Sequence, residues 1–318
     1  MKNYLRSRNK EFKLIERNNA CPICGEKFYF QNQKIPKQRF IKCRNCGVFS
    51  IDPVDPNDLD KGLEKAELMT QNIYLHEKKI SQHMDYRFRD LAFGEYIEEI
   101  NKYKVYGNIL DIGCGIGSFL LAIKKFGWNE YGIELSSAAN LAIELGLNVF
   151  QTDFLNTQFD KDFFDVITLF DVIEHISEPI IFLEKIKTIL RPGGLLLIIT
   201  PNLKGISSRL LKHNWLAYTQ IDHVILYSPK TLSLLLSKKN FKLKQIKTSE
   251  IYITELIFRR NNAPNKEEYR QKEQLRKREL ISLLITNKPI KFIRYLINLL
   301  FSYFHFGDRI IVYSENEI

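Results

Sequence analysis

Four of the five cysteines in this 318-residue chain fall into two pairs of identical spacing. The pairs are Cys21-Pro-Ile-Cys24-Gly and Cys43-Arg-Asn-Cys46-Gly, with eighteen residues between them. Each turn presents two thiolates and the glycine relieves its tight backbone, so the two turns together offer four sulfur ligands in a closed tetrahedral set. We therefore predict a structural Zn²⁺ site in a small zinc ribbon, with no ligand position left open for catalysis.

A glycine-rich turn is the second group of residues able to do chemistry. It reads Leu110-Asp-Ile-Gly-Cys-Gly-Ile-Gly117 and lies where a predicted strand gives way to a helix. Gly113, Gly115 and Gly117 permit backbone angles closed to other residues and allow close approach to a ligand. The GxGxG spacing is not the dinucleotide GxGxxG, and Asp111 beside the turn suits a cationic ligand better than a pyrophosphate.

A carboxylate follows the glycine turn at the end of the next predicted strand, YGIEL. This residue, Glu134, stands twenty-one positions after Gly113, where a carboxylate can accept hydrogen bonds from both hydroxyls of a ribose. The glycine turn and Glu134 together predict a site for a nucleoside-containing ligand at the carboxyl edge of a parallel sheet.

The elements that must position these residues alternate in type. From residue 108 onward, short apolar runs alternate with helical segments, which predicts βαβ units and a parallel sheet with helices on both faces. Leu195–Ile199 is apolar at every position, as is typical of a strand buried on both sides. Later segments predict a helix opened by Ser228-Pro229, a strand in FKLKQIKTSEIYITELIF and a final strand in DRIIVYSE, with a basic helical insertion at 259–306 between these two strands.

Composition divides the chain into three parts. Residues 1–52 are predicted to form the zinc ribbon with a basic N-terminal arm, 53–107 a linker with leading helices, and 108–318 the main domain. The boundary falls in the turn-rich Asp52–Asn57, which cannot continue a helix or a central strand.

These motifs resemble the class I S-adenosylmethionine-dependent methyltransferases, especially the small-molecule group that includes the ubiquinone-biosynthesis O-methyltransferases. The similarity covers about 108–255 and extends through FDVITLFDVIEHISEP, LRPGGLLLIITPN and HNWLAYTQIDHVILYSPKTLSLLL. It implies an α/β, Rossmann-like sheet of seven strands with helices on both faces. It also implies S-adenosyl-L-methionine as the cofactor and methyl transfer as the reaction.

The resemblance further implies which residues surround that cofactor. Those expected to line its methionine and backbone side are Asp111, Gly113, Gly115 and Gly117. Glu134 is expected to bind the ribose, Asp153 and Phe154 to flank the adenine, and Phe170 and Asp171 to close the pocket. Packing in the core is the alternative for both phenylalanines, because aromatic side chains dominate protein cores.

Methyl transfer from a sulfonium requires alignment and exclusion of water, and a hydroxyl or acidic carbon acceptor must also lose a proton. Histidine suits that step near neutral pH. The candidates are His223, preceded by Asp222, and His175, in the loop after the fourth strand; a structural role is the alternative for each. Trp215 and Tyr218 are expected to form a wall of the acceptor site.

The formal net charge of +10 is concentrated at two places. Residues 1–46 hold twelve Lys and Arg against three Glu, and residues 259–294 hold eleven against four. Two basic segments are compatible with solvation, an anionic substrate or a membrane surface. Our leading prediction is a small-molecule or lipid-linked saccharide acceptor. The alternatives are an RNA methyltransferase that uses the ribbon and the basic ends, and a non-catalytic adaptor that binds the cofactor.

The segment 290–306, IKFIRYLINLLFSYFHF, is apolar and aromatic but too short and too interrupted for a membrane span. Peripheral contact with a membrane through this segment is one expectation, and packing against the sheet edge or a second subunit is the other. The charged N-terminal sequence predicts no secretory signal and hence a cytoplasmic location. In a reducing compartment, paired cysteines indicate metal ligands instead of disulfides.

Overall fold

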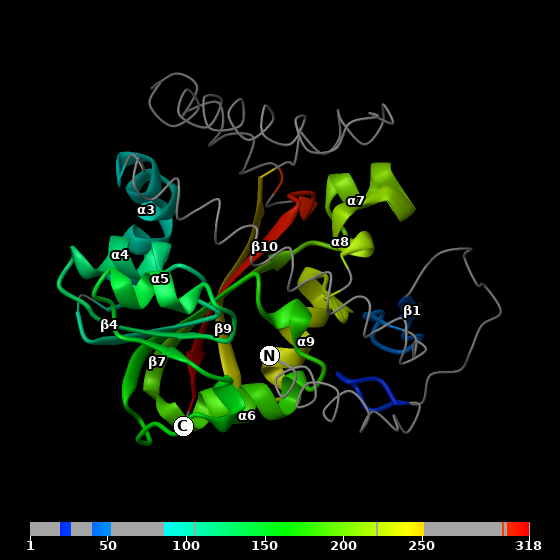
Figure 1. The fold of residues 1–318 in the computed structure, drawn as a ribbon. Helices are drawn as coiled ribbons and strands as arrows, with labels where there is room; N and C mark the ends of the chain where they lie inside the picture. The colour runs from blue at the N-terminus through cyan, green and yellow to red at the C-terminus, as the bar shows by residue number, and fades with distance from the viewer. Residues whose placement is uncertain are drawn as a thin grey trace.

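The computed structural model describes residues 20–26, 40–51, 86–104, 106–220, 222–250, 301 and 304–317. Its centre is a seven-stranded sheet with the order β5-β4-β3-β6-β7-β10-β9 (Figure 1). The strands are β3 (Asn108–Ile112), β4 (Asn129–Glu134), β5 (Val149–Gln151), β6 (Phe164–Phe170), β7 (Leu190–Pro201), β9 (Phe241–Ser249) and β10 (Arg309–Asn316). The first five pair in parallel, whereas β10 lies antiparallel between β7 and β9. The chain proceeds outward from β3 in both directions, so the doubly wound sheet has its switch point beside β3 and β6.

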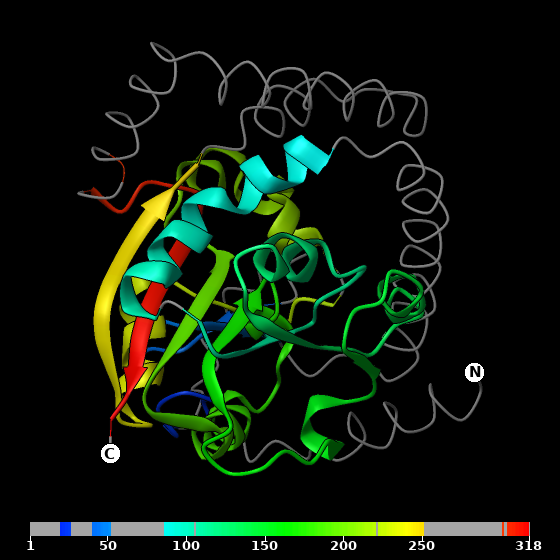
Figure 2. The same cartoon turned by 90° about the vertical axis from the view of Figure 1, so that its left-hand side faces the viewer.

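Helices cover both faces of this sheet, as the sequence predicts (Figures 1 and 2). One face carries α3 (Tyr86–Tyr103), α4 (Ser118–Lys124) and α5 (Ala139–Glu144), and the other carries α6 (Pro179–Ile189) and α9 (Pro229–Ser237). Strand β7 contributes side chains to the hydrophobic cores on both faces of the sheet. Its residues 195, 197 and 199 pack into the α3 to α5 side and its residues 196 and 198 into the other, because side chains alternate along a strand.

The N-terminus of α9 illustrates how local sequence sets an element. The Ser228 side chain accepts a hydrogen bond from the Thr231 amide, and the Thr231 hydroxyl accepts one from the Ser228 amide. This reciprocal capping box satisfies two amides that the helix itself leaves unpaired, and Pro229 supplies a helical φ at the first position. The predicted helix start at Ser228-Pro229 is confirmed.

A second, three-stranded sheet joins the cysteine segment to the main domain. Its strands are β1 (Phe40–Lys42), β2 (Phe49–Ile51) and β8 (Ile225–Leu226), in the order β1-β2-β8 with antiparallel pairing. Between β7 and β8 the chain forms α7 (Ile206–Leu211), η3 (Lys212–Asn214) and α8 (Leu216–Thr219), none of which the sequence analysis predicted. Two further single turns, η1 (Phe154–Asn156) and η2 (Ile173–His175), follow β5 and β6.

The prediction of a seven-stranded Rossmann-like sheet is confirmed, including both late strands. The basic N-terminal arm, the first of the leading helices and nearly all of the 259–306 insertion lie outside the described residues. Among the described helices, none combines the length and apolar character that crossing a bilayer requires.

Candidate functional site

The glycine turn lies at the carboxyl end of β3, and all three of its glycines have positive φ: 76° at Gly113, 54° at Gly115 and 77° at Gly117. A Cβ at Gly113 would lie 2.5 Å from a methyl carbon of Val172, and one at Gly117 would lie 2.3 Å from a methyl carbon of Leu147. A Cβ at Gly115 would meet no atom of the described chain within 4 Å. The outer glycines are therefore fixed by packing, whereas the middle one faces open space.

Glu134, at the carboxyl end of β4, holds the turn directly. Its carboxylate accepts hydrogen bonds from the Gly115 amide at 3.0 Å and from the Ser136 amide at 2.7 Å. Each carboxylate oxygen has a second lone pair that can accept a hydroxyl hydrogen. The carbonyl of Glu134 also accepts from the Thr152 amide at 3.2 Å, which ties the end of β4 to the start of the Asp153 segment.

Asp111 lies on β3 beneath the turn and is buried. Its carboxylate accepts a hydrogen bond from the Thr168 hydroxyl of β6 at 2.7 Å. Burial raises the pKa of Asp111 to about 7, and the negative charge of Glu134 acts in the same direction, whereas the Thr168 hydrogen bond lowers it. The site thus has two interacting carboxyls that a nearby positive charge would stabilise in the ionised form.

The structure separates Asp153 from Phe154. Asp153 is half-buried and caps η1, accepting from the Leu155 amide at 2.8 Å. The Phe154 ring is buried and meets the Phe182 ring edge-on, with centroids 4.9 Å apart, so the core alternative describes its side chain. Lys185 of α6 donates to the Leu155 and Thr157 carbonyls and covers the Phe154 ring at 5.1 Å, which fixes this turn from below.

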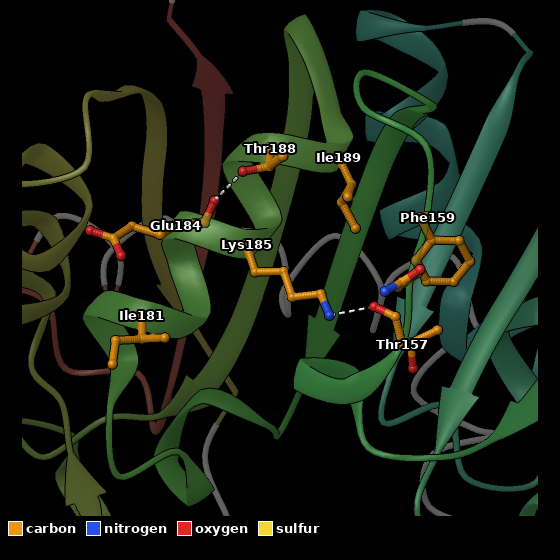
Figure 3. A pocket seen from close by; sticks show the side chains of 8 residues that line it. Thr157, Phe159, Ile181, Glu184, Lys185, Thr188 and Ile189 are labelled. Carbon is orange, nitrogen blue, oxygen red and sulfur yellow. Dashed lines mark hydrogen bonds between the residues drawn. The ribbon is translucent and has the colours of Figure 1, made fainter.

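A cavity of about 480 Å³ lies between α6 and the residues that follow η1 (Figure 3). Its lining residues are Thr157, Gln158, Phe159, Ile181, Glu184, Lys185, Thr188 and Ile189. This set includes none of the predicted site residues.

Phe170 is the last residue of β6 and Asp171 follows it directly, and their side chains contact different partners. The Phe170 ring lies 4.9 Å from Phe119 of α4 and within 5.8 Å of Phe93 and Tyr96 of α3, so it belongs to an aromatic cluster that closes this end of the sheet. Asp171 has a positive φ of 55° and forms an ion pair with Arg309 at the start of β10. Sequence reasoning missed the aromatic side chains of α3, since a helix preceding the main domain carried no motif.

The two candidate histidines lie together, with ring centroids 4.8 Å apart and an edge-on arrangement. His175 Nδ1 lies 3.0 Å from the carbonyl oxygen of Asp222 and 3.4 Å from its carboxylate. His223 is buried, and its Nδ1 lies 3.1 Å from the Ala217 carbonyl. Because a carbonyl only accepts, each neutral ring donates from Nδ1 and carries its lone pair on Nε2. Burial lowers the pKa of His223 to about 4, with neighbouring His175 as the next cause.

Glu174 is the functional candidate that sequence reasoning did not select. It is buried, one of its carboxylate oxygens accepts from the Thr200 hydroxyl at 2.9 Å, and the other, Oε1, has no hydrogen-bond partner among the described residues. Burial raises the pKa of Glu174 to about 7. Ligand atoms of Glu174, His175 and His223 lie within 4.8 Å of one another, a spacing at which they could share a cation. The Glu-His pair in the sequence was the available signal.

The expected acceptor wall is wrong for Trp215. Its side chain is fully buried in the core, and its ring packs edge-on against Tyr218 with centroids 5.2 Å apart. Tyr218 is only partly buried but packs against Phe40 and Phe49 of the cysteine segment. The Tyr218 ring thus contacts the small sheet and the Trp215 ring contacts Tyr218, an arrangement that the sequence could not show.

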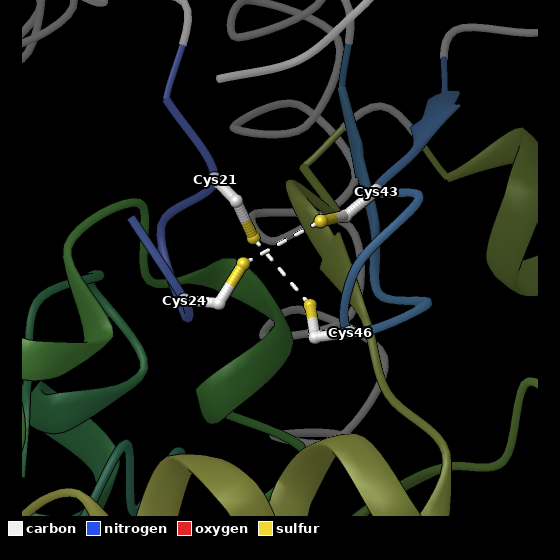
Figure 4. A group of neighbouring side chains, drawn as sticks. All are labelled: Cys21, Cys24, Cys43 and Cys46. Atoms are coloured by element: carbon white, nitrogen blue, oxygen red, sulfur yellow. Dashed lines mark hydrogen bonds between the residues drawn. The ribbon is translucent and has the colours of Figure 1, made fainter. Parts of the chain in front are cut away.

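The four paired cysteines converge from two turns (Figure 4). Sγ of Cys21 lies 3.6 Å from that of Cys46, and Sγ of Cys24 lies 3.5 Å from that of Cys43. All four sulfur atoms fall within 4.8 Å of one another and none forms a disulfide. Sulfur atoms at the corners of a tetrahedron with Zn–S bonds of about 2.3 Å are about 3.8 Å apart, so this donor set fits a zinc ion.

The open, doubly wound sheet with a glycine turn and a following carboxylate at its switch point defines a domain that binds nucleotide-like ligands. A family model described as a methyltransferase domain matches residues 48–246, which is more than half of the chain. The chain belongs to this methyltransferase domain family, and the resemblance to class I methyltransferases drawn from the motifs is confirmed.

Among similar proteins is a ubiquinone biosynthesis O-methyltransferase of Actinobacillus pleuropneumoniae, 31% identical over 43% of this chain and 61% of that protein. Another of the same name, from a Chelativorans species, is 31% identical over 38% of this chain and 49% of that protein. The chain thus spans between about half and three fifths of these relatives. A solved SAM dependent methyltransferase from Archaeoglobus fulgidus is 19% identical over 76% of this chain and 99% of its own, with a TM-score of 0.49.

Proposed function

We propose that this chain is an S-adenosyl-L-methionine-dependent methyltransferase. The observation that carries the proposal is the contact between the Gly115 amide and the Glu134 carboxylate, beneath the open space above Gly115. The site offers carboxyl groups from Asp111 and Glu134 in place of a phosphate-binding helix terminus. Such a site favours a cationic adenosyl sulfonium over a dinucleotide.

The proposed roles follow from position along the carboxyl edge of neighbouring strands β5, β4, β3 and β6. Glu134 accepts the ribose hydroxyls through its remaining lone pairs, and the Asp153 segment takes the adenine side. The glycine turn lets the backbone approach the methionine portion, with Asp111 below it. Phe170, Asp171 and the aromatic residues of α3 exclude water from the far side. When bound, the cofactor supplies a methyl group on a sulfonium leaving group.

We infer that His175 is the general base, with His223 as the buried ring that orients it. His175 is partly exposed, and the Asp222 carbonyl fixes its Nδ1 as the donor, which leaves the lone pair on Nε2. His223 has only 3% of its surface exposed and a lowered pKa, which suits packing more than proton exchange with an acceptor. Glu174 lies below both rings and can stabilise the imidazolium that forms.

The proposed acceptor is a small molecule, and the proposed methylated atom is a hydroxyl oxygen. Support comes from the names of the relatives, which are O-methyltransferases of ubiquinone biosynthesis, and from the presence of a histidine base, which an oxygen acceptor requires. A lipid-linked or anionic acceptor fits the basic segments. Peripheral membrane contact through 290–306 remains a prediction on residues mostly outside the described part of the chain.

We further propose that Cys21, Cys24, Cys43 and Cys46 hold a structural zinc ion and that the protein works in the cytoplasm, where such thiols stay reduced. The near-tetrahedral spacing of their sulfur atoms supports the metal. The division into 1–52, 53–107 and 108–318 is retained as a proposal about the sequence, although the small sheet joins the first part to the third.

Methyl-labelled S-adenosyl-L-methionine, incubated with the purified protein and fractionated cell extract, tests this function. We expect label in a low-molecular-mass or lipid-soluble fraction, and we expect it to be lost with a Glu134→Ala variant. Label confined to RNA would contradict the acceptor class. No transfer to any fraction, with the protein shown to be folded, would contradict the enzyme.

A further inference from the structure

The cysteine segment is not folded as a separate module, because its sheet takes a strand from the methyltransferase domain. Strand β2 pairs with β8 in the register Phe49 with Leu226 and Ser50 with Ile225. A two-stranded hairpin alone is marginal in water, and the third strand with its apolar face is what stabilises such a sheet. Strand β8 begins two residues after His223, so the sheet ends where the histidine site begins.

The two parts also share one hydrophobic core. Cys21, Cys43 and Cys46 are buried in the same cluster as Trp215 and the run 224–227. The Tyr218 ring is held by both sides, since its centroid lies 5.7 Å from Phe40, 6.4 Å from Phe49 and 5.2 Å from Trp215. The segment 215–227 therefore contacts the cysteine segment at two places, through the Tyr218 ring and through strand β8.

The opposite side of the same segment carries the histidine site. The Ala217 carbonyl holds His223 Nδ1, and the carbonyl of Asp222 holds His175 Nδ1. The Val224 amide donates to the Glu174 carbonyl at 2.8 Å, which fastens the segment to η2. Both of these ring hydrogen bonds are thus accepted by carbonyl groups of residues within 215–227.

Tyr227 links the two centres most directly. It is fully buried, and its hydroxyl lies 3.5 Å from the Ile173 carbonyl in η2, next to Glu174. Its side chain belongs to the same buried cluster as Cys21, Cys43 and Cys46. Tyr227 therefore joins the core around the cysteine turns to the turn that carries Glu174.

We propose that the four-cysteine metal centre is a positioning element of the acceptor side. The ion fixes the β1-β2 hairpin, and the hairpin supplies the surface on which 215–227 packs. This segment in turn fixes the orientation of the His175 and His223 rings. The inference rests on the proposed function for the meaning of those histidines. It assigns the cysteine centre an internal role in the enzyme in place of the recognition of RNA or another macromolecule.

The cofactor side has different support. Within the glycine turn, Cys114 and Ile116 belong to two clusters that contain no described residue of the cysteine segment, whereas Leu110 and Ile112, on β3 before the first glycine, belong to the large cluster that also includes it. The hydrogen bonds of its carboxylates stay within the central sheet and the turn: Glu134 of β4 accepts from the Gly115 amide, and Asp111 of β3 accepts from the Thr168 hydroxyl of β6. Perturbing the cysteine centre should consequently affect the histidines and the acceptor much more than the cofactor.

The test uses the full chain with histidine ring carbons labelled for NMR, and the His175 and His223 signals assigned with His175→Gln and His223→Gln variants. Zinc is removed with a chelator and its loss confirmed by metal analysis. We expect both histidine signals to shift or broaden. Binding of S-adenosyl-L-homocysteine, measured by calorimetry, should stay within about twofold, as for independent sites. Turnover should fall about 10- to 100-fold, since small misplacements of catalytic groups have effects of that size.

A variant that keeps all four cysteines distinguishes a positioning effect from unfolding caused by loss of the metal. Phe49→Ala removes a ring that packs on Tyr218, whereas Arg44→Ala changes an exposed position on the Cys43 turn and serves as the matched control. We expect Phe49→Ala to retain zinc and cofactor affinity, to shift both histidine signals and to lower turnover. We expect the His175 and His223 signals of both Phe49→Tyr and Arg44→Ala to match those of the wild type.

The outcomes separate this inference from the proposed function. Histidine signals that do not move when zinc is lost, or a purified protein that contains no zinc, would overturn the positioning role while leaving methyl transfer intact. Loss of cofactor binding in parallel with the histidine changes would also overturn it, because the metal would then support the whole domain. Failure of the untreated protein to bind S-adenosyl-L-homocysteine would refute the proposed function alone.

Discussion

Alanine substitutions at Gly115 and Gly117 should separate ligand binding from stability, with the larger loss of affinity expected at Gly115 and the larger loss of stability at Gly117. Both glycines have positive φ, yet only a Cβ at Gly117 meets neighbours, at 2.3 Å from Leu147 and 3.1 Å from Ala142. Leu147 and Ala142 are both buried, so neither can move aside freely. At Gly115 the added methyl group would point into the space assigned to the cofactor.

The magnitudes follow from these contacts. Gly115→Ala carries only the cost of a left-handed backbone, about 1–2 kcal/mol. Gly117→Ala carries the same cost plus overpacking of about 1–3 kcal/mol, for a total of about 2–5 kcal/mol. Because 1 kcal/mol corresponds to about 2–4 °C in a domain of this size, Gly117→Ala should lower Tm by roughly 4–20 °C and Gly115→Ala by roughly 2–8 °C.

The assay pairs thermal unfolding with calorimetric titration of S-adenosyl-L-homocysteine at a temperature where both variants are folded. We expect Gly115→Ala to lose at least about tenfold in affinity, since a methyl group without room costs more than about 1.4 kcal/mol. Gly117→Ala should lose more stability than Gly115→Ala. A Gly115→Ala protein with unchanged affinity would refute the placement of the ligand above this glycine.

The remaining predictions concern single side chains. Glu134→Gln places a side-chain amide group against the backbone amide of Gly115 or Ser136. It should weaken cofactor binding about 10- to 100-fold by calorimetry, because an unpaired polar group costs about 1–3 kcal/mol. Unchanged affinity would exclude Glu134 from cofactor binding. His175→Ala should abolish most turnover and leave cofactor affinity unchanged, whereas His223→Ala should lower turnover less; the reverse order in steady-state kinetics would exchange their roles. Burial raises the pKa of Asp111 from 3.8 in the unfolded chain to about 7 in the folded protein. Between about pH 4 and pH 7 the unfolded chain therefore releases this proton while the folded protein keeps it, so the free energy of unfolding falls as the pH rises through that interval. In urea unfolding, the wild type should therefore lose up to about 4 kcal/mol relative to Asp111→Asn across that interval, and parallel pH curves would contradict this.

The sequence predicted most of the elements that build the site, for identifiable reasons. A strand segment buried on both sides is apolar at every position, as in residues 195–199 of β7, and the capped start of α9 has a direct signature in Ser228-Pro229. The three glycines were predictable because each needs a backbone angle that other residues rarely adopt. These are local constraints, so they leave a mark in the local sequence.

The parts that the sequence did not predict depend on contacts between distant segments. Strand β8 is only two residues long and exists because β2 lies beside it, 175 positions earlier in the chain. Trp215 is a core residue for a similar reason, since it is buried in a cluster that gathers residues from the cysteine segment and from the main domain. The buried state of Glu174 follows from packing against Thr200 and the 222–224 segment, and no local pattern distinguishes it from an exposed glutamate.

The central claim is that the glycine turn, with Glu134 beside it, receives a cationic adenosyl sulfonium. Titration of the folded, purified protein with S-adenosyl-L-methionine, compared with NAD⁺ in the same cell, tests this most directly. We expect saturable 1:1 binding of S-adenosyl-L-methionine, no comparable binding of the dinucleotide, and loss of S-adenosyl-L-methionine binding in Glu134→Ala. A folded protein that binds neither S-adenosyl-L-methionine nor its demethylated product would contradict it.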